Sequence, residues 1–97
     1  MTNLRKLARD QPCQVRVPLH CNGDPATTVL AHYRMASLSG IGMKAPDVFG
    51  AWCCSKCHDL IDGRARSDYT RIELHWMHAE GVFRTQAALL NMGKIKV

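Results

Sequence analysis

The sequence has no long apolar run and few acidic side chains, and both absences narrow what the protein can be. No stretch of its 97 residues approaches the roughly 18 apolar residues that a membrane-spanning helix needs. No apolar segment follows the basic residues 5–9, as it would in a secretory signal peptide. Internal repeats and low-complexity segments are missing too. We therefore expect one soluble, cytoplasmic domain over residues 1–97, with no membrane partner.

Acidic residues are outnumbered, since 8 Asp and Glu stand against 13 Lys and Arg and leave a net charge of +5. The pI near 9.2 favours an acidic partner, and nucleic acid is the leading candidate. The alternative is an ordinary basic surface. Residues 1–10 form a basic N-terminal arm that either contacts DNA or packs Leu4 and Leu7. A chain this short buries a limited core, so a metal ion would add useful stability.

Five cysteines force a choice between disulfides and a metal site. Their odd number and the Cys-x-x-Cys spacing of Cys54 and Cys57 favour reduced thiols that bind metal in the cytosol. We expect a structural zinc site with four thiolate ligands, Cys13, Cys21, Cys54 and Cys57. His20 is a rival ligand for either upstream cysteine, and Cys53 is expected to point elsewhere. The alternative is that some of these thiols are simply buried apolar side chains.

The Cys-x-x-Cys pair runs directly into His58, and Asp62 follows four residues later. If residues 57–62 are helical, these two side chains lie on one face, one turn apart. Imidazole and carboxylate suit magnesium or manganese better than thiolate does, so the pair can hold a second, catalytic divalent ion. Gly63 is expected to end this helix at its C′ position.

Short strands are expected in the first half of the chain. Residues 15–17 alternate apolar with polar side chains and predict one strand. Residues 27–33 are β-branched and apolar and predict a second, with His32 toward its end. The stretch 22–25, Asn-Gly-Asp-Pro, is a turn signal between them. Glycines and a proline predict a loop over residues 34–50.

A long helix is expected in the C-terminal region, residues 67–93. It would run from Tyr69 to about Met92, with Ser67 or Asp68 as its N-cap. These limits make the helix the longest element of the chain.

Apolar side chains recur along this helix at three- and four-residue steps. The predicted stripe consists of Ile72, Trp76, Ala79, Val82, Phe83 and Leu90. We expect it to face the core, and the alternative is that it pairs the protein with another copy as a homo-oligomer. Gly81 marks a close packing contact. His75 and His78 are interpreted as surface or packing residues.

Several runs of residues resemble the HNH, or His-Me finger, nucleases. Ala31-His32, a Gly-rich loop and Cys54-x-x-Cys57-His58 follow the order of their motif. The chain is also similar, over nearly its full length, to the small YbcO-type nucleases of lambdoid phages. The runs that carry this second resemblance are Val-Leu-Ala-His-Tyr-Arg (29–34), Phe-Gly-Ala-Trp (49–52), Cys-x-x-Cys-His-Asp-x-Ile-Asp-Gly-Arg (54–64) and Glu-Gly-Val-Phe-Arg-Thr-Gln (80–86).

The resemblance implies a small α+β fold, a zinc-stapled ββα-metal core with a long C-terminal helix. His32 would be the general base that activates water. His58 would be the helix ligand of the catalytic ion, with Asp62 as a second ligand. Asp47 falls near the position whose side chain orients the first His. Ala31 is a departure, because many relatives carry an acidic ligand immediately before the catalytic His.

The activity implied by the resemblance is that of a metal-dependent DNA endonuclease, which hydrolyses phosphodiester bonds in phage or prophage DNA recombination or replication. The side chains expected to hold phosphates, if they are not solvated surface charges, are Arg34, Lys44, Arg64 and Arg66. The alternative is a non-catalytic, zinc-containing nucleic-acid-binding module. In that case His32 and His58 would serve packing or phosphate contact.

Overall fold

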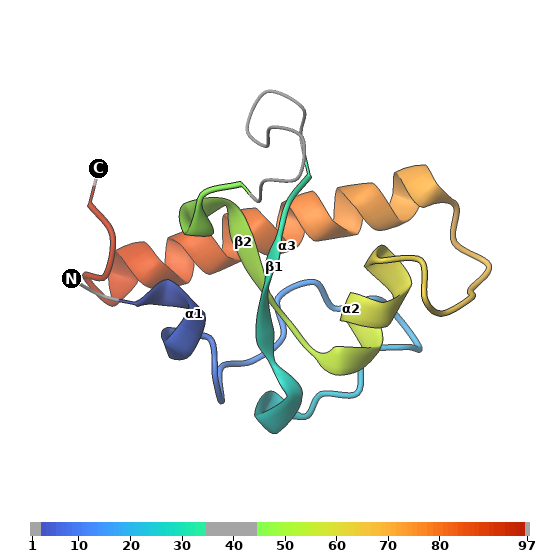
Figure 1. The fold of residues 1–97 in the computed structure, drawn as a ribbon, viewed down its shortest axis with the longest axis horizontal. Helices are drawn as coiled ribbons and strands as arrows, with labels where there is room; N and C mark the ends of the chain where they lie inside the picture. Colours follow the sequence, from blue (N-terminus) through green and yellow to red (C-terminus); the bar gives the residue numbers. More distant parts are fainter. Residues whose placement is uncertain (1–2, 35–44, 97) are drawn as a thin grey trace.

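A computed structural model describes residues 3–34 and 45–96 of the chain (Figure 1). Lys44, one of the expected phosphate contacts, lies outside these residues. In chain order, the elements are α1 (Leu4–Leu7), the 3₁₀ turn η1 (Pro25–Thr27), β1 (Val29–His32), the 3₁₀ turn η2 (Asp47–Phe49), β2 (Gly50–Cys53), α2 (Ser55–Ile61) and α3 (Arg71–Asn91). Together they form a small α+β protein.

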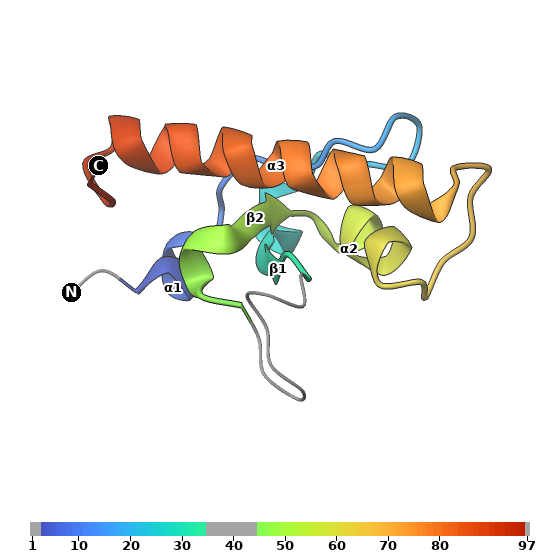
Figure 2. The same cartoon turned by 90° about the horizontal axis from the view of Figure 1, so that it is seen from above.

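The two strands pair antiparallel, with Ala31 opposite Ala51 and His32 opposite Gly50. Helix α3 packs along β2 and forms one layer, while the strands, α1 and α2 form the other (Figure 2). The predicted strand over residues 27–33 is confirmed but is shorter. Residues 35–44 of the predicted loop over 34–50 lie outside the described residues, and in the described part η2 and the first residue of β2 fall within its bounds.

Helix α2 begins and ends at residues that suit those positions. The Cys54 sulfur accepts a hydrogen bond from the Cys57 backbone N–H and caps the first turn. Gly63 has φ of 79°, which is the left-handed conformation that glycine adopts without strain at C′. Residues 57–61 are helical and Asp62 is the C-cap, so the predicted helix and its stop signal are confirmed.

Helix α3 starts later than predicted. Thr70, not Ser67 or Asp68, is the N-cap, because its side chain accepts from the Glu73 backbone N–H while the Glu73 carboxylate accepts from the Thr70 backbone N–H. This reciprocal capping box satisfies two N–H groups that the first turn leaves free. Within the described part of the chain, no helix has both the length and the apolar character needed to cross a membrane.

The predicted strand at residues 15–17 is wrong. Arg16 has φ of 54° and Leu19 has φ of 68°, so the chain turns sharply where a strand would stay extended. Val15 and Val17 are both buried, as they would be on one face of a strand, but a bent loop and not a sheet buries them. A Cβ added to Gly81 would lie 2.8 Å from Val15 Cγ2, which confirms the predicted close contact at this glycine.

The predicted core stripe of α3 is also wrong, since only Val82 among its members is buried. Ile72, Trp76 and Phe83 are 69%, 66% and 68% exposed. The face that packs inward carries Leu74, His78, Gly81, Val82, Thr85 and Leu89. Gly81 and Thr85 explain the choice of face: the first admits the Val15 backbone, and the Thr85 hydroxyl accepts from the Trp52 backbone N–H at 2.9 Å.

Candidate metal centre and histidine sites

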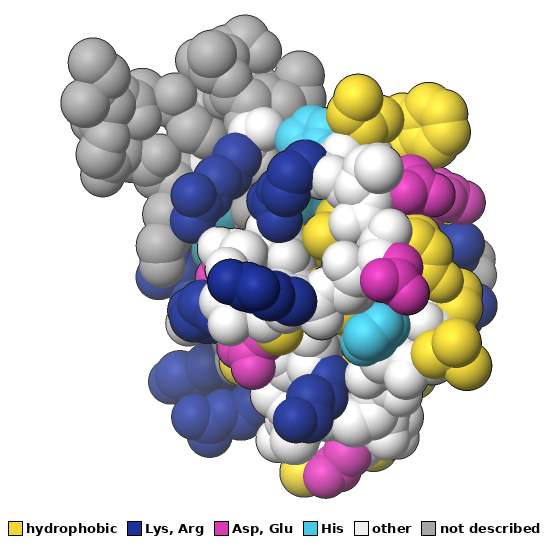
Figure 3. All heavy atoms as spheres, turned by 90° about the vertical axis from the view of Figure 1, so that its right-hand side faces the viewer, with side chains coloured by type: hydrophobic (Ala, Val, Ile, Leu, Met, Phe, Trp, Pro, Cys, Tyr) yellow, Lys and Arg dark blue, Asp and Glu magenta, His cyan; other side chains and the backbone are white. Residues whose placement is uncertain are grey.

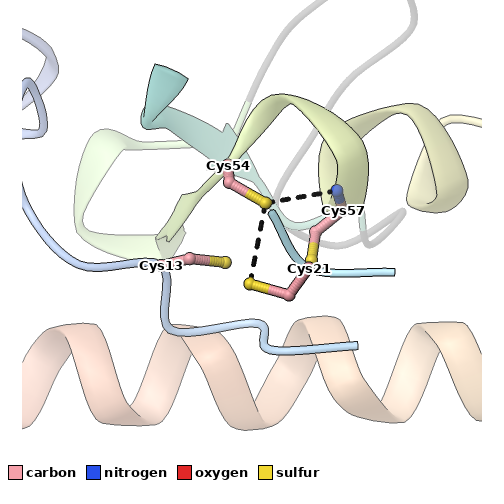
Figure 4. A group of neighbouring side chains, drawn as sticks. All are labelled: Cys13, Cys21, Cys54 and Cys57. Carbon is pink, nitrogen blue, oxygen red and sulfur yellow. Dashed lines mark hydrogen bonds between the residues drawn. The ribbon is translucent and has the colours of Figure 1, made fainter. Parts of the chain in front are cut away.

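Four cysteines from two distant parts of the chain meet at one point, as the sequence predicted (Figure 4). Cys13 and Cys21 come from the loop before η1, and Cys54 and Cys57 come from the first turn of α2. Their sulfur atoms all lie within 4.8 Å of one another. The sharp turns at Arg16 and Leu19 bend the loop, and this bend brings its two thiols to the same place.

The chemistry of this cluster fits a metal ion. Backbone N–H groups of Val17 and Cys57 donate to the sulfurs of Cys57 and Cys54, at 3.4 and 3.5 Å, and such donors favour thiolate over thiol. Cys54 Sγ and Cys21 Sγ are 3.8 Å apart. Zn–S bonds of about 2.3 Å in a tetrahedron separate the sulfurs by roughly the same distance. None of the cysteines forms a disulfide, so the cluster can hold a metal such as zinc.

Neither rival residue belongs to the cluster. Cys53 is fully buried in β2, and its hydrogen bond to the Cys13 sulfur raises its pKa far above the usual value, so it stays a neutral thiol. His20 lies edge-on to the ring of Tyr69, with centroids 6.2 Å apart. Neither Cys53 nor His20 is therefore a ligand candidate in this structure, and both lie outside the four-sulfur cluster.

His32 forms a hydrogen-bonded pair at the end of β1. Its Nε2 lies 2.7 Å from Asp47 Oδ1, and Arg5 Nε donates to the same carboxylate oxygen at 3.2 Å. The hydrogen bond from His32, and then that from Arg5, lower the pKa of Asp47. An ionised carboxylate accepts the Nε2–H, which leaves the second ring nitrogen of His32 as an acceptor.

His58 and Asp62 form a second pair, one turn apart on α2. His58 Nε2 lies 3.3 Å from Asp62 Oδ2, and Arg64 Nη2 lies 3.2 Å from His58 Nδ1 and 3.3 Å from that same oxygen. Because a guanidinium can only donate, His58 Nδ1 is the acceptor, and the ring proton is on Nε2, which faces the Asp62 carboxylate. In the described residues, no hydrogen bond or ion pair joins this pair to His32 and Asp47.

His78 is a third histidine near β1, and no motif of the sequence assigns it a chemical role. It is buried on α3, and its Nε2 lies 2.8 Å from the carbonyl oxygen of Ala31, which only an N–H can satisfy. Burial lowers the pKa of His78. Its prediction as a packing residue is confirmed, while His75 is exposed beside Tyr33, at a ring-centroid distance of 4.5 Å.

Basic side chains surround the His32 pair more closely than expected. A hollow of about 600 Å³ is lined by Arg5, Arg9, Asp10, residues 26–30 and His32. The sequence predicts Arg5 and Arg9 only as parts of a basic N-terminal arm. Their four-residue spacing indicates that both could lie on one face of a helix, but only the fold shows that α1 packs beside β1. Arg34 and Arg66 are exposed, after β1 and after α2 respectively.

These features define a small α+β protein in which a four-cysteine, metal-type cluster fixes a loop to a helix that carries a His–Asp pair. The family model described as "Putative nuclease YbcO" matches residues 2–94, and the chain belongs to that family. Two relatives are each 44% identical over 104 residues, with 99% of both chains covered: "Putative nuclease YbcO" of Escherichia coli (strain K12) and "Putative nuclease ybcO" of Enterobacteria phage 82.

A solved structure supports the same relationship. It is titled "Structure of a putative bacteriophage protein from Escherichia coli str. K-12 substr. MG1655" and is 41% identical to this chain, with a TM-score of 0.78. The match covers 94% of this chain and all of the other. The expected membership of the YbcO-type family is thereby confirmed.

Proposed function

We propose that this protein is a metal-dependent DNA endonuclease of the HNH type that hydrolyses phosphodiester bonds in phage or prophage DNA recombination or replication. The names of its relatives support a nuclease. The observation that carries the proposal is the His32–Asp47 pair, at 2.7 Å, on the rim of an arginine-lined hollow. A general base, an orienting carboxylate and phosphate-binding cations are the groups that this reaction needs.

His32 acts as the general base. With Nε2–H donated to Asp47, the lone pair on Nδ1 takes a proton from water near neutral pH. The hydroxide oxygen then bonds to phosphorus while the bond from phosphorus to the leaving sugar oxygen breaks. Asp47 holds the ring in place and stabilises the positive charge that it acquires, and Arg5 in turn holds Asp47.

His58 and Asp62 are the residues of this chain that would hold the catalytic magnesium or manganese ion, and imidazole with carboxylate is a suitable donor set. A divalent ion there would supply Lewis-acid stabilisation of the charge that develops on the phosphate and leaving oxygens. Arg64 now supplies the positive charge beside both side chains. Its side chain is 57% exposed, so it can swing out to a neighbouring phosphate. The four-cysteine cluster would hold zinc as a structural ion.

DNA would lie across the basic side of the molecule. Figure 3 shows Lys and Arg side chains gathered toward one side and hydrophobic ones toward the other. Arg5 and Arg9 would contact the strand near His32, with Arg34 beside them and Arg64 and Arg66 beyond α2. Contacts of this kind neutralise phosphates without reading sequence.

A non-catalytic, zinc-containing nucleic-acid-binding module is the second candidate. Ala31 favours it, because this residue offers no ligand at a position that is acidic in many HNH nucleases. Arg64 also favours it, since its guanidinium already neutralises the His58–Asp62 pair. A protein of this kind would bind DNA with the same basic side and would leave every substrate uncut.

The test is cleavage of plasmid and branched DNA by zinc-loaded protein, with and without magnesium or manganese. His32→Ala should abolish cleavage and leave DNA affinity within about twofold, because the imidazole acts on water. His75→Ala is the matched control, since His75 is an exposed histidine on α3, and it should cut like the parent. Full activity in His32→Ala would show that the assignment of the base is wrong. Binding without cleavage by the parent protein would favour the second candidate.

A further inference from the structure

Helix α3 is apolar on two separate faces, and the fold buries only one of them. The inward face carries Leu74, His78, Gly81, Val82, Thr85 and Leu89. On the outward face, Ile72, Trp76 and Phe83 are each about two-thirds exposed and Leu90 is 39% exposed. A helix that needed only to cover this core would carry polar residues there. Hydrophobic side chains line the corresponding edge of the molecule in Figure 3.

The outward residues follow a coiled-coil spacing. We name the seam of α3 as Ile72, Trp76, Ala79, Phe83, Gln86 and Leu90, which are separated by steps of four and three in strict alternation. This pattern keeps one narrow stripe in line over the whole helix, and it is the pattern by which two helices pack with interlocking side chains.

We propose that the seam pairs with the seam of a second copy of this chain, with the two α3 helices antiparallel about a two-fold axis that crosses the seam at the level of Gly81. Gly81 is the middle residue of Arg71–Asn91, so this register overlaps the helices over their full length. It places Phe83 against Ala79 of the other copy, a large side chain against a small one. The same register is self-complementary, as a two-fold interface requires.

The remaining seam pairs fit as well. Ile72 would face Leu90, and Trp76 would face Gln86. The Gln86 Nε2 donates to the Val48 carbonyl at 2.8 Å, which leaves its amide oxygen free to accept from an indole N–H. Each copy therefore offers partners to both aromatic side chains of the other copy, and no third molecule is needed to cover them.

Size and charge also suit a second copy. Covering the exposed parts of the four large apolar seam residues on both copies would bury about 1,000 Å² in total, which is near the lower limit for a specific interface. Charges beside the seam are already satisfied, because Glu73 caps the helix and Glu80 pairs with Arg84 at 3.3 Å. Figure 3 shows Lys and Arg side chains gathered toward the side away from most hydrophobic ones, so pairing through an apolar face would leave the basic side open.

The mass in solution tests this proposal. Sedimentation equilibrium of the zinc-loaded chain should give twice the 10.9 kDa of one chain at high micromolar concentration and a lower average on dilution. Phe83→Glu should remain at the mass of one chain with an unchanged circular dichroism spectrum. The control is Leu19→Glu, because Leu19 is fully exposed in the loop before η1, and this variant should associate like the parent. A parent protein that stays monomeric at every concentration would overturn the proposal.

A second variant tests the register. Ala79→Trp adds apolar area to the seam but removes the space that Phe83 of the other copy would fill, so association should weaken at least tenfold. If the seam were only a sticky patch, the added indole would strengthen association, and that result would overturn the antiparallel pairing. Neither outcome depends on whether the protein cleaves DNA.

Discussion

Gly81→Ala should destabilise the protein even though alanine is the better helix former. A Cβ at this position would lie 2.8 Å from Val15 Cγ2 and 3.1 Å from both Val15 Cα and Val15 N. Rotation of the valine side chain can relieve the first contact, but the other two involve backbone atoms and require the loop to move. Overpacking of this kind costs about 1–3 kcal/mol, against a gain of about 1 kcal/mol from helix propensity. The difference is a net loss of up to about 2 kcal/mol, and the two backbone contacts place it toward the upper end of that range.

The loss can be measured by urea unfolding of zinc-loaded protein at fixed metal concentration. Ala87→Gly is the control for propensity, because Ala87 is exposed on the same helix, and it should cost about 1 kcal/mol. Val15 is two residues from Cys13, so Gly81→Ala should also release zinc more readily to a chelator, which Ala87→Gly should not. A Gly81→Ala protein more stable than the parent would refute the close approach of α3 to this loop.

Three further predictions follow from the same contacts. Cys57→Ser should lower the bound zinc from one ion per chain toward none, and the variant should lose much of its folded structure. Cys53→Ser should keep the ion. Metal analysis measures the bound zinc of each variant, and circular dichroism measures its folded structure. The lowered pKa of Asp47 stabilises the fold above the ordinary carboxyl pKa near 3.8, and this contribution is lost as pH falls through the lowered value. The difference in unfolding free energy between the parent and Asp47→Asn should therefore shrink between pH 6 and pH 3, and a constant difference would contradict the ion pair. Thr70→Ala should lower the free energy of unfolding in urea by about 1 kcal/mol, while Asp68→Ala should leave it almost unchanged. Equal losses in the two variants would show that Thr70 is not the N-cap of α3.

The cysteine cluster could be predicted from the sequence because few residues of the chain could complete a metal site with the Cys-x-x-Cys pair. A Cys-x-x-Cys pair at the start of a helix needs further ligands, and only Cys13, Cys21, Cys53 and the histidines were available. The His58–Asp62 pair was predictable for a similar reason, since helical geometry alone brings side chains four residues apart together. Both predictions depend on local spacing.

The face of α3 could not be predicted in this way. Periodicity identifies an apolar stripe but cannot say which of two stripes packs inward, and the more strongly apolar one lies outside. The inward face was selected by Gly81, where a missing side chain admits the Val15 backbone. The alternating pattern at residues 15–17 predicted a strand wrongly, because a pattern of buried side chains does not say what buries them. A bent loop buries both valines here, and no sheet is involved.

Contacts between segments that are distant in the sequence could not be predicted either. Asp47 was placed near the orienting position only by resemblance, and its 2.7 Å contact with His32 depends on η2 folding back beside β1. Arg5 and the hydrogen bond from His78 to the Ala31 carbonyl depend on tertiary packing in the same way. No pattern in the sequence reports such pairs.

The most direct test of the central claim is nicking of supercoiled plasmid by zinc-loaded protein as a function of added magnesium or manganese. The same titration on His58→Ala, purified in parallel, excludes a contaminating nuclease. The account predicts nicked and linear DNA that appear only with the added ion and only with the parent protein. DNA that is bound but stays supercoiled at every ion concentration would contradict it, and would assign the basic side and the cysteine cluster to binding alone.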